Sequence, residues 1–442
     1  MSKGNWSWVL LAAFAALPAC DTPLDTDPTA SIDSGTALNT ARGIELGLNG
    51  AYRSLQSGSL FSLNHIVYPD LYADNLDFTG TFQTDREVGL RSLSASNGAV
   101  AGIWAAAYAG INRVNNILDA VPDASGMDDA DRALARGEAL FIRAVHYSVL
   151  ALWFGGVPLV LEPSEGVGAD ALVSRATRED VYARIEADLE EAVPLLPAGR
   201  VNGRATQGAA NALLARVYLE NEKYAQARDK ATTVIGSGTY GLVANYRDLF
   251  DDQNASESVF ELQYSVNNQN SAAFWFFPQA LGGRFGFGPS AGLFNAYEAG
   301  DDRRDASIAT SGATRYGNKY FRIANGDDNI TVLRLAEMYL IRAEANLRLG
   351  ADAALIRDDL NVLRNRSGLG NLPSSVTGQT ALLDAILQEA RVEFAMEGHR
   401  FFDLRRNDRA EQILAISADR LLFPIPQGER DVNPNLTQNP GY

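Results

Sequence analysis

The sequence predicts a mainly α-helical protein built from pairs of antiparallel helices. Apolar residues recur at steps of three and four along most of the chain, which is the period of an amphipathic helix. Small residues stand where two such helices would cross, and a polar and aromatic stretch in the middle predicts a long irregular insertion. With 46% hydrophobic residues among 442, the chain has enough apolar side chains for a substantial core.

The first half of the chain contains four segments with helical periodicity. They cover residues 41–54, 104–118, 130–153 and 177–194. The third segment is followed by Gly155, Gly156 and Pro158, which stop a helix. The fourth begins with Thr177 followed three residues later by Asp180, an arrangement typical of a helix N-terminus.

Two later segments predict helical hairpins. Residues 209–236 carry Ala215 and Ala227 at the expected crossing, where small side chains let two antiparallel helices approach closely. A second pair is predicted over 332–349 and 353–366, with a glycine in the turn. The spacing resembles that of tetratricopeptide hairpins, which stack on their neighbours. We therefore expect the hairpins to form a right-handed array.

The middle of the chain differs in composition from the helical segments. Residues 259–264 alternate like a short strand. Residues 267–294 mix Asn, Gln, Ser, Gly and Pro with aromatic residues, and this mixture predicts a loop-rich segment. Because a loop of this length inside a compact domain is usually functional, we expect it to take part in binding.

The N-terminus resembles a bacterial lipoprotein signal. A barely charged start, an apolar run from Trp8 to Leu17 and two compact residues precede Cys20, the single cysteine of the chain. The apolar run is too short to span a bilayer, which takes about 20 residues. In a lipoprotein Cys20 would carry the lipid anchor. An ordinary cleaved signal with a cysteine there by chance is the other interpretation.

These patterns divide the chain into a signal peptide over 1–19, a flexible acidic tether over 20–39 and one folded domain over 40–442. The tether is rich in Asp, Thr, Pro and Ser and has almost no apolar residues, so it cannot bury a core. Asp21, Asp25 and Asp27 are either solvated spacer residues or an export signal for the outer face of the membrane. The sequence leaves both interpretations open.

The charged residues, the histidines and the absence of catalytic motifs argue against an enzyme and against a bound cofactor. The formal net charge of −16 repels phosphate backbones and argues against nucleic acid as a partner. His65, His146 and His399 lack the spacing of metal ligands, so we expect packed histidines and no metal or other cofactor. A phosphate loop and a nucleophile elbow are absent. We predict a protein that is not an enzyme, although its many carboxylates leave a hydrolytic pair open.

The C-terminal third carries a distinctive order of motifs. Residues 333–345 read LRLAEMYLIRAEA, 360–369 LNVLRNRSGL, 397–405 EGHRFFDLR, 422–426 LFPIP and 438–442 QNPGY. Together with Trp104, Arg143 and the GGVPL run at 155–159, this order resembles the SusD/RagB family of outer-membrane nutrient-binding lipoproteins. The resemblance covers essentially all of the mature chain.

The resemblance implies a tetratricopeptide-like helical fold with an N-terminal half over 40–250, a ligand-binding insertion over 251–330 and a C-terminal half over 331–442. It implies a surface lipoprotein that captures a glycan or oligopeptide without transforming it and delivers it to a SusC-like TonB-dependent channel. For the 397–405 segment, paired ions inside the helical packing and a binding site are the two interpretations. A tetratricopeptide-like adaptor lipoprotein that binds a protein or peptide is the alternative function.

A sugar-binding site needs aromatic faces for the rings and planar polar groups for the hydroxyls. The middle segment supplies Trp275 and Phe277 together with Asn268 and Arg284. The other interpretation is that its aromatic run only packs the loop onto the helices. A second segment, 68–91, lacks clear periodicity and supplies the remaining candidates, Asp74, Asn75, Phe82 and Arg86. Asp74 has a competing interpretation as a helix cap or turn residue.

Overall fold

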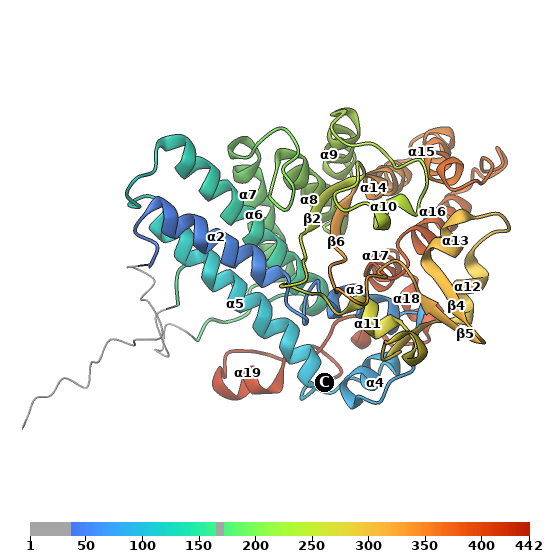
Figure 1. The fold of residues 1–442 in the computed structure, drawn as a ribbon, viewed down its shortest axis with the longest axis horizontal. Coiled ribbons are helices and arrows are strands. Elements are labelled where there is room, and N and C mark those ends of the chain that lie inside the picture. The colour runs from blue at the N-terminus through green and yellow to red at the C-terminus, as the bar shows by residue number, and fades with distance from the viewer. Residues whose placement is uncertain (1–36, 165–171) are drawn as a thin grey trace, which may run out of the picture.

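The computed structural model describes residues 37–164 and 172–442. Helices dominate the described chain (Figure 1). The helices of the first half are α2 (Ala41–Leu55), α3 (Asn64–Tyr72), α4 (Gln83–Gly89), α5 (Gly98–Ala120), α6 (Asp129–Phe154), α7 (Arg178–Ala192), α8 (Gln207–Glu220) and α9 (Tyr224–Gly236). Those of the last part are α14 (Leu335–Arg348), α15 (Ala353–Arg366), α16 (Gln379–Glu393), α17 (Arg400–Arg406), α18 (Ala410–Leu414) and α19 (Gln427–Val432).

The long helices pack as neighbours in one continuous series. Each of α5, α6, α7, α8 and α9 packs against the next, and α2 lies on α5 and α6. The series then continues from α9 to α14 and on to α15, although the whole middle segment separates α9 from α14 in the sequence (Figure 1). The predicted mainly α fold of tetratricopeptide-like hairpins is confirmed.

The two predicted hairpins are the pairs α8/α9 and α14/α15. Ala215 and Ala227 are completely buried, as expected where two helices come close. The second hairpin begins later than predicted, because residues 332–334 belong to strand β6 (Ile330–Arg334). This strand pairs with β2 (Ser258–Leu262), and Leu333 lies opposite Phe260. The backbone hydrogen bonds of residues 332–334 are therefore those of a β ladder and not those of a helix.

Two helix ends that the sequence predicted are formed by capping residues. The hydroxyl of Thr177 accepts a hydrogen bond from the backbone N–H of Asp180 at 3.1 Å and so caps α7. Helix α6 ends at Gly155, whose φ of 74° is a conformation that favours glycine. Both predicted boundaries are confirmed.

Short elements make up the middle of the chain. These are α10 (Asp248–Asp251), α11 (Ala272–Phe276), α12 (Ala291–Ala296), α13 (Asp302–Ser307), β3 (Phe287–Pro289), β4 (Ile308–Ser311) and β5 (Thr314–Gly317). The strand predicted over 259–264 is β2. The predicted loop over 267–294 holds α11, β3 and most of α12, which are too short to show a period in the sequence. Strand pairs are β1 (Leu76–Phe78) with β3, β2 with β6, and β4 with β5, all antiparallel.

A buried ion network ties the middle segment to α16. The Glu393 carboxylate contacts the guanidinium groups of Arg303 at 3.0 Å, Arg334 at 2.6 Å and Arg366 at 2.5 Å. Burial opposes ionisation of Glu393, but the three guanidinium groups outweigh it and hold its pKa well below its ordinary value. The charged motif residues of the C-terminal third are therefore part of the interior.

The described part begins inside the predicted tether. Leu38 is buried, and the Asn39 carbonyl accepts a hydrogen bond from the backbone N–H of Ser125 at 2.9 Å. The folded domain therefore starts by Leu38, before the predicted boundary at residue 40. Cys20, the signal peptide and the rest of the tether lie outside the described residues.

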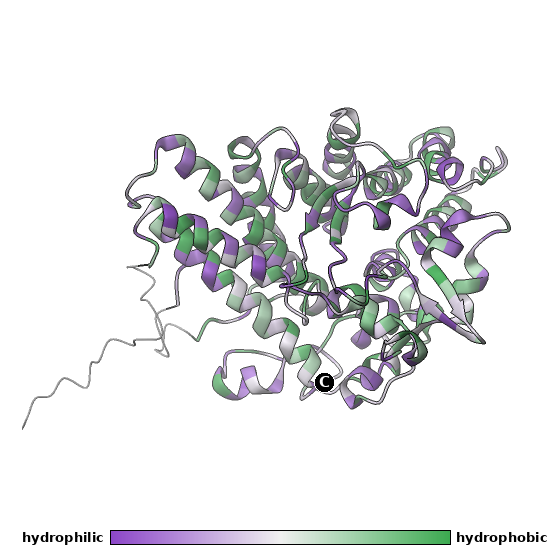
Figure 2. Ribbon diagram, in the orientation of Figure 1, coloured by the Kyte–Doolittle hydropathy of each residue, from purple (hydrophilic) through white to green (hydrophobic). Residues whose placement is uncertain are grey.

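The long helices carry hydrophobic and hydrophilic residues in alternating patches, as amphipathic helices do (Figure 2). The second half of helix α6 is deeply placed, since all of its residues from Gly137 to Phe154 are buried. Within ranges 37–164 and 172–442, every helix is too short or too polar to cross a membrane.

Candidate functional site

A short antiparallel ladder brings the two candidate binding segments together. Strand β1 follows α3 and pairs with β3, with Leu76 opposite Pro289 and Phe78 opposite Phe287. Beyond the ladder, the backbone N–H of Thr79 donates to the Gly286 carbonyl at 3.0 Å. Helix α4, which follows β1, thereby lies beside α11, which precedes β3 (Figure 1).

Phe82, Trp275 and Arg284 form a surface group that we call the aromatic cluster. The rings of Phe82 and Trp275 meet edge to face with centroids 5.9 Å apart. The Arg284 guanidinium lies 4.9 Å from the centroid of Phe82 and 5.7 Å from that of Trp275. Phe82 is 47% exposed and the neighbouring Phe274 is 42% exposed, so the cluster presents aromatic surface to solvent.

The backbone beneath the cluster fixes the indole. A Cβ on Gly286 would lie 2.7 Å from Cε3 of Trp275, so only glycine leaves room for the ring at this point. The Gly286 N–H also donates to the Trp275 carbonyl at 2.8 Å. Trp275 is therefore held from below by its own loop and from the side by Phe82.

Arg86 lies next to the cluster on the same helix side as Phe82. Phe82 caps α4 and Arg86 follows four residues later, with its N–H donating to the Phe82 carbonyl at 3.1 Å. The Arg86 guanidinium lies 5.7 Å from the centroid of Phe78. Four predicted residues, Phe82, Arg86, Trp275 and Arg284, are thus brought together by the fold.

Two predicted residues of the middle segment lie elsewhere. Phe277 is buried, and its ring packs 4.7 Å from that of Tyr316. Asn268 is half-buried in the turn after β2, where its Nδ2 donates to Oε1 of Gln56 at 2.7 Å. Phe277 therefore matches the packing interpretation of the aromatic run, while Trp275 keeps an exposed surface.

Asp74 and Asn75 belong to a hydrogen-bond network that joins α3 to the C-terminal helices. Arg400 donates to both carboxylate oxygens of Asp74, at 2.8 and 3.2 Å, and Arg391 approaches the same carboxylate at 3.1 Å. Arg391 also donates to Oδ1 of the buried Asn75 at 2.9 Å. Burial opposes ionisation of Asp74, but Arg400 and Arg391 prevail and lower its pKa.

A surface groove adjoins the aromatic cluster on the other side of Phe78. Its volume is about 690 Å³, and it lies between α4, β1 and the start of α12. Phe78 and Leu90 give it apolar walls, and Arg86 and Arg91 line it with guanidinium groups. We refer to it as the β1 groove. A cavity of this size lies within the range of small-molecule sites.

Sequence reasoning missed the part of Arg91 in the groove. Arg91 stands at a left-handed φ of 56°, and its guanidinium Nε donates to the Tyr72 carbonyl at 2.7 Å. A composition-based search could not find it, because its role depends on how the chain turns after α4. Phe78 lay within the candidate segment. Its contact with Arg86 follows from the β1–β3 ladder, which the sequence did not predict.

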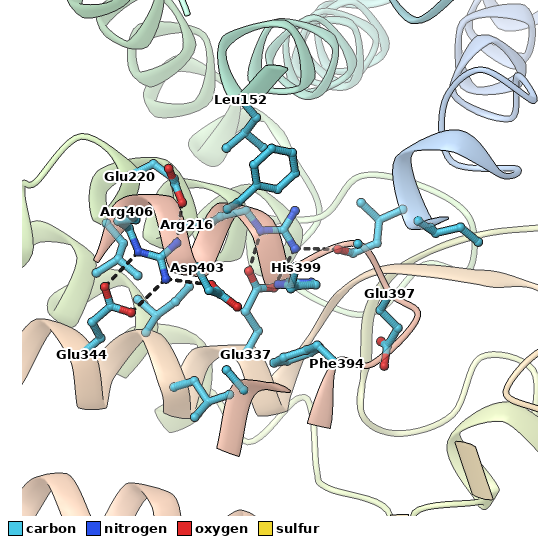
Figure 3. Close-up of a pocket in the computed structure, with 18 of the residues that line it drawn as sticks. Leu152, Arg216, Glu220, Glu337, Glu344, Phe394, Glu397, His399, Asp403 and Arg406 are labelled. Atoms are coloured by element: carbon cyan, nitrogen blue, oxygen red, sulfur yellow. Dashed lines mark hydrogen bonds and ion pairs between the residues drawn. The ribbon is translucent and has the colours of Figure 1, made fainter. Parts of the chain in front are cut away.

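A second cavity lies in the interior, where α8, α14 and α17 meet (Figure 3). Its volume is about 60 Å³. Arg406 donates to both oxygens of Glu344 at 2.9 Å and to Asp403 at 2.8 Å, and Arg216 donates to Glu337 at 2.7 Å (Figure 3). Each of these carboxylates is held by an arginine.

Burial shifts the pKa values of the ionisable groups around this cavity. Burial raises the pKa of Asp403 to about 6, although Arg406 acts against that rise. Burial also lowers the pKa of His399 well below its ordinary value, with Arg216 acting in the same direction. These contacts favour the structural interpretation of the 397–405 segment.

His65 and His146 are buried, and His399 is half-buried and stacks on Phe394 with ring centroids 4.3 Å apart. His65 Nδ1 accepts a hydrogen bond from the Trp153 indole at 3.2 Å. Among the residues that the structure describes, no group of three or more His, Cys, Asp or Glu side chains is placed to hold a metal ion.

The fold and this surface define a helical-array domain with an aromatic cluster beside a groove. Two family models match the chain: one described as the SusD family over residues 318–419, and one described as "starch-binding associating with outer membrane" over residues 11–219. A SusD-like protein of Formosa agariphila is 24% identical over 501 residues, covering 99% of this chain and 98% of that protein.

Two further relatives bear on the same comparison. The starch-binding protein SusD of Bacteroides thetaiotaomicron is 26% identical over 440 residues, covering 75% of this chain and 76% of that protein. The solved structure of a laminarin-binding SusD-like protein superimposes with a TM-score of 0.81 at 26% identity, over 91% of this chain and 100% of that chain. The chain belongs to the SusD/RagB family.

Proposed function

We propose that this protein is an outer-membrane lipoprotein that binds a glycan at the aromatic cluster and passes it to a SusC-like TonB-dependent channel. The observation that carries the proposal is the pair formed by the exposed Phe82 ring and the half-buried Trp275 ring, with Arg284 stacked on both. It is the meeting point of the two segments that the sequence marked for binding.

The chemistry of the cluster suits a sugar. The apolar face of a pyranose ring packs on an aromatic face, and its hydroxyls need planar donors and acceptors beside that face. The exposed Phe82 ring and the Trp275 indole offer the first. Arg284, which also donates to the Thr81 hydroxyl at 3.3 Å, offers the second. Two relatives, a starch-binding and a laminarin-binding protein, support a glycan as the ligand class.

The membrane part of the proposal rests on Cys20 and on the family. Cys20 would carry the lipid, and the tether would keep the domain beside its channel at a high effective concentration. The outer-membrane association of the matching starch-binding family supports this location. Asp21, Asp25 and Asp27 would specify the cell-surface face.

We further propose that the glycan leaves unchanged. Two described carboxylates of the segment that contains Phe82 have other partners: Asp74 pairs with Arg400 and Arg391, and Asp85 accepts a hydrogen bond from Tyr68 at 2.6 Å. A hydrolytic site would need a pair of carboxylates facing the bound sugar. Product analysis after incubation with each bound glycan tests this point, and release of shorter sugars would contradict it.

The binding proposal is tested by a glycan screen on the purified protein and on Trp275→Ala. Loss of the indole removes half of the aromatic pair, so affinity for the best ligand should fall at least about fivefold, since stacking contributes about 1 kcal/mol. Tyr339→Ala, which removes a half-buried aromatic ring from α14, is the matched control and should leave affinity unchanged. Equal affinity of Trp275→Ala and the native protein would exclude the cluster as the site.

Delivery and anchoring have their own measurements. Outer membranes solubilised in detergent should yield this protein together with a large barrel protein. Metabolic labelling with a lipid precursor should add acyl mass at Cys20, and Cys20→Ser should abolish it. A protein that is always isolated alone, or that carries no lipid, would remove these parts of the proposal. Specific capture of peptides with no glycan binding would instead favour the adaptor function.

A further inference from the structure

The β1 groove and the aromatic cluster form one continuous surface. Phe82 and Arg86 lie one turn apart at the start of α4, and Arg86 reaches over Phe78, which forms a wall of the groove. A chain-like ligand stacked on the cluster would therefore extend over Phe78 and place its next unit in the groove. The groove has the space for this, at about 690 Å³.

Guanidinium groups without carboxylate partners gather on this surface. Among the described residues, no carboxylate lies within ion-pair distance of Arg86, Arg91 or Arg284. Arg284 contacts the two rings and Thr81, and Arg91 donates to the carbonyls of Tyr72 and Ala73. Carbonyl oxygens carry no net charge, so these contacts supply no ion-pair partner, and Asp74 acts on Arg91 only from beyond ion-pair distance.

The acidic groups of the groove offset this charge only in part, since Arg86, Arg91 and Arg391 line it against Asp74 and Asp77. Asp74, which lines the groove, is already paired with Arg391 and Arg400. Asp77 is the opposing carboxylate that remains exposed on the lining. The surface is therefore locally positive on a chain whose formal net charge is −16. An anion approaching this protein is repelled by most of its surface and attracted here.

We infer that the β1 groove binds the carboxylate or sulfate group of an acidic glycan, one unit along from the sugar that stacks on the aromatic cluster. This inference rests on the proposed glycan-binding function and adds a ligand class to it. A guanidinium group presents a planar fork of N–H donors that matches carboxylate and sulfate oxygens. A neutral glycan would leave Arg86 and Arg91 without an ion-pair partner.

The test compares three classes of soluble polysaccharide on the full chain purified in detergent. Dextran, carboxymethyl-dextran and dextran sulfate share a backbone, and a wider panel of neutral, uronate-containing and naturally sulfated polysaccharides covers other backbones. Retention in affinity gels and calorimetry are measured for the native protein and for Arg86→Ala. Arg113→Ala is the matched control, because Arg113 is an exposed arginine on α5, away from the groove.

The expected result is that an acidic polysaccharide binds most tightly and that Arg86→Ala weakens it at least tenfold. Arg113→Ala should change that affinity less than twofold, and the affinity should fall with added salt. The uronate and sulfate arms distinguish the two anions. Tight binding of neutral polysaccharides alone, or equal effects of the two arginine variants, would overturn the inference while leaving the proposed function intact. Binding of no polysaccharide at all would overturn both.

Discussion

The Phe82 ring meets the Trp275 ring at a centroid distance of 5.9 Å and an interplanar angle of 62°. One residue caps α4 near the N-terminus of the domain, and the other belongs to α11 in the middle segment. The β1–β3 ladder holds these two elements in register, so the rings are positioned before any ligand arrives.

This relationship predicts the effect of changing Phe82. Phe82→Ala removes an exposed ring from the binding surface and the side support of Trp275, so we expect affinity for the best glycan to fall at least about fivefold. Phe82→Tyr keeps the ring and should bind within about twofold of the native protein. Titration calorimetry measures both. Unchanged affinity in Phe82→Ala would contradict a role for this ring.

The buried network around Glu393 predicts a large loss of stability in Glu393→Gln. This change removes a charge that Arg303, Arg334 and Arg366 share, and breaking a buried ion pair costs about 3–5 kcal/mol. Glu191→Gln breaks the exposed pair with Arg136 and should cost less than about 1 kcal/mol. Urea unfolding compares the two variants, and similar losses would show that the network contributes little.

Gly110 and Gly50 predict opposite signs for the same substitution. A Cβ on Gly110 would lie 2.1 Å from Nε2 of His146, so Gly110→Ala should destabilise the protein by about 1–3 kcal/mol. A Cβ on Gly50, within α2, would meet nothing within 4 Å. Gly50→Ala should therefore stabilise it by about 0.5–1 kcal/mol through helix propensity. Thermal unfolding followed by circular dichroism measures both shifts, and a stabilised Gly110→Ala would contradict the packing described.

His146 predicts a pH dependence. The Ser54 hydroxyl donates to the Ala51 carbonyl at 2.6 Å, so His146 Nε2, 2.9 Å from that hydroxyl, is the donor between them. The other ring nitrogen, Nδ1, is buried without an acceptor among the described residues. A proton added there would be buried without a partner, and burial, aided by Arg113, lowers the pKa of His146 to about 3.

Because this pKa is lowered on folding, the contribution of His146 to stability is complete above its ordinary pKa of 6.5 and is lost as the pH falls toward 3. The native protein should therefore lose stability faster than His146→Gln on acidification, by about 1 kcal/mol per pH unit between pH 6 and 4. Urea unfolding at a series of pH values gives the two slopes. Parallel slopes would show that His146 is already protonated in the folded protein.

The helical architecture could be read from the sequence, because it depends on local patterns. The three- and four-residue period marked α2, α5, α6 and α7, and the Thr177 and Gly155 signals marked helix ends. Strand β6 could not be separated from α14, because residues 332–334 become a strand only when β2 lies beside them. Elements of three to six residues, such as α11 and β3, carry too few residues to show a period.

The candidate site shows the same division. Composition selected both Trp275 and Phe277 from one aromatic run, but it could not tell which ring would face Tyr316 and which would stay at the surface. It also selected Asp74 and Asn75, whose partners Arg400 and Arg391 lie more than three hundred residues away. A polar residue is available to a ligand only if no distant residue has already satisfied it.

The sequence by itself determined the helical class, the family motifs and the two segments that form the proposed binding surface, since each of these depends on residues that are neighbours in the chain. The tertiary structure decided which residues of those segments meet. The ladder between β1 and β3 joined Phe82 to Trp275, and the turn after α4 brought Arg91 to the groove beside Arg86. Such contacts depend on long-range strand pairing and burial, which no local pattern encodes.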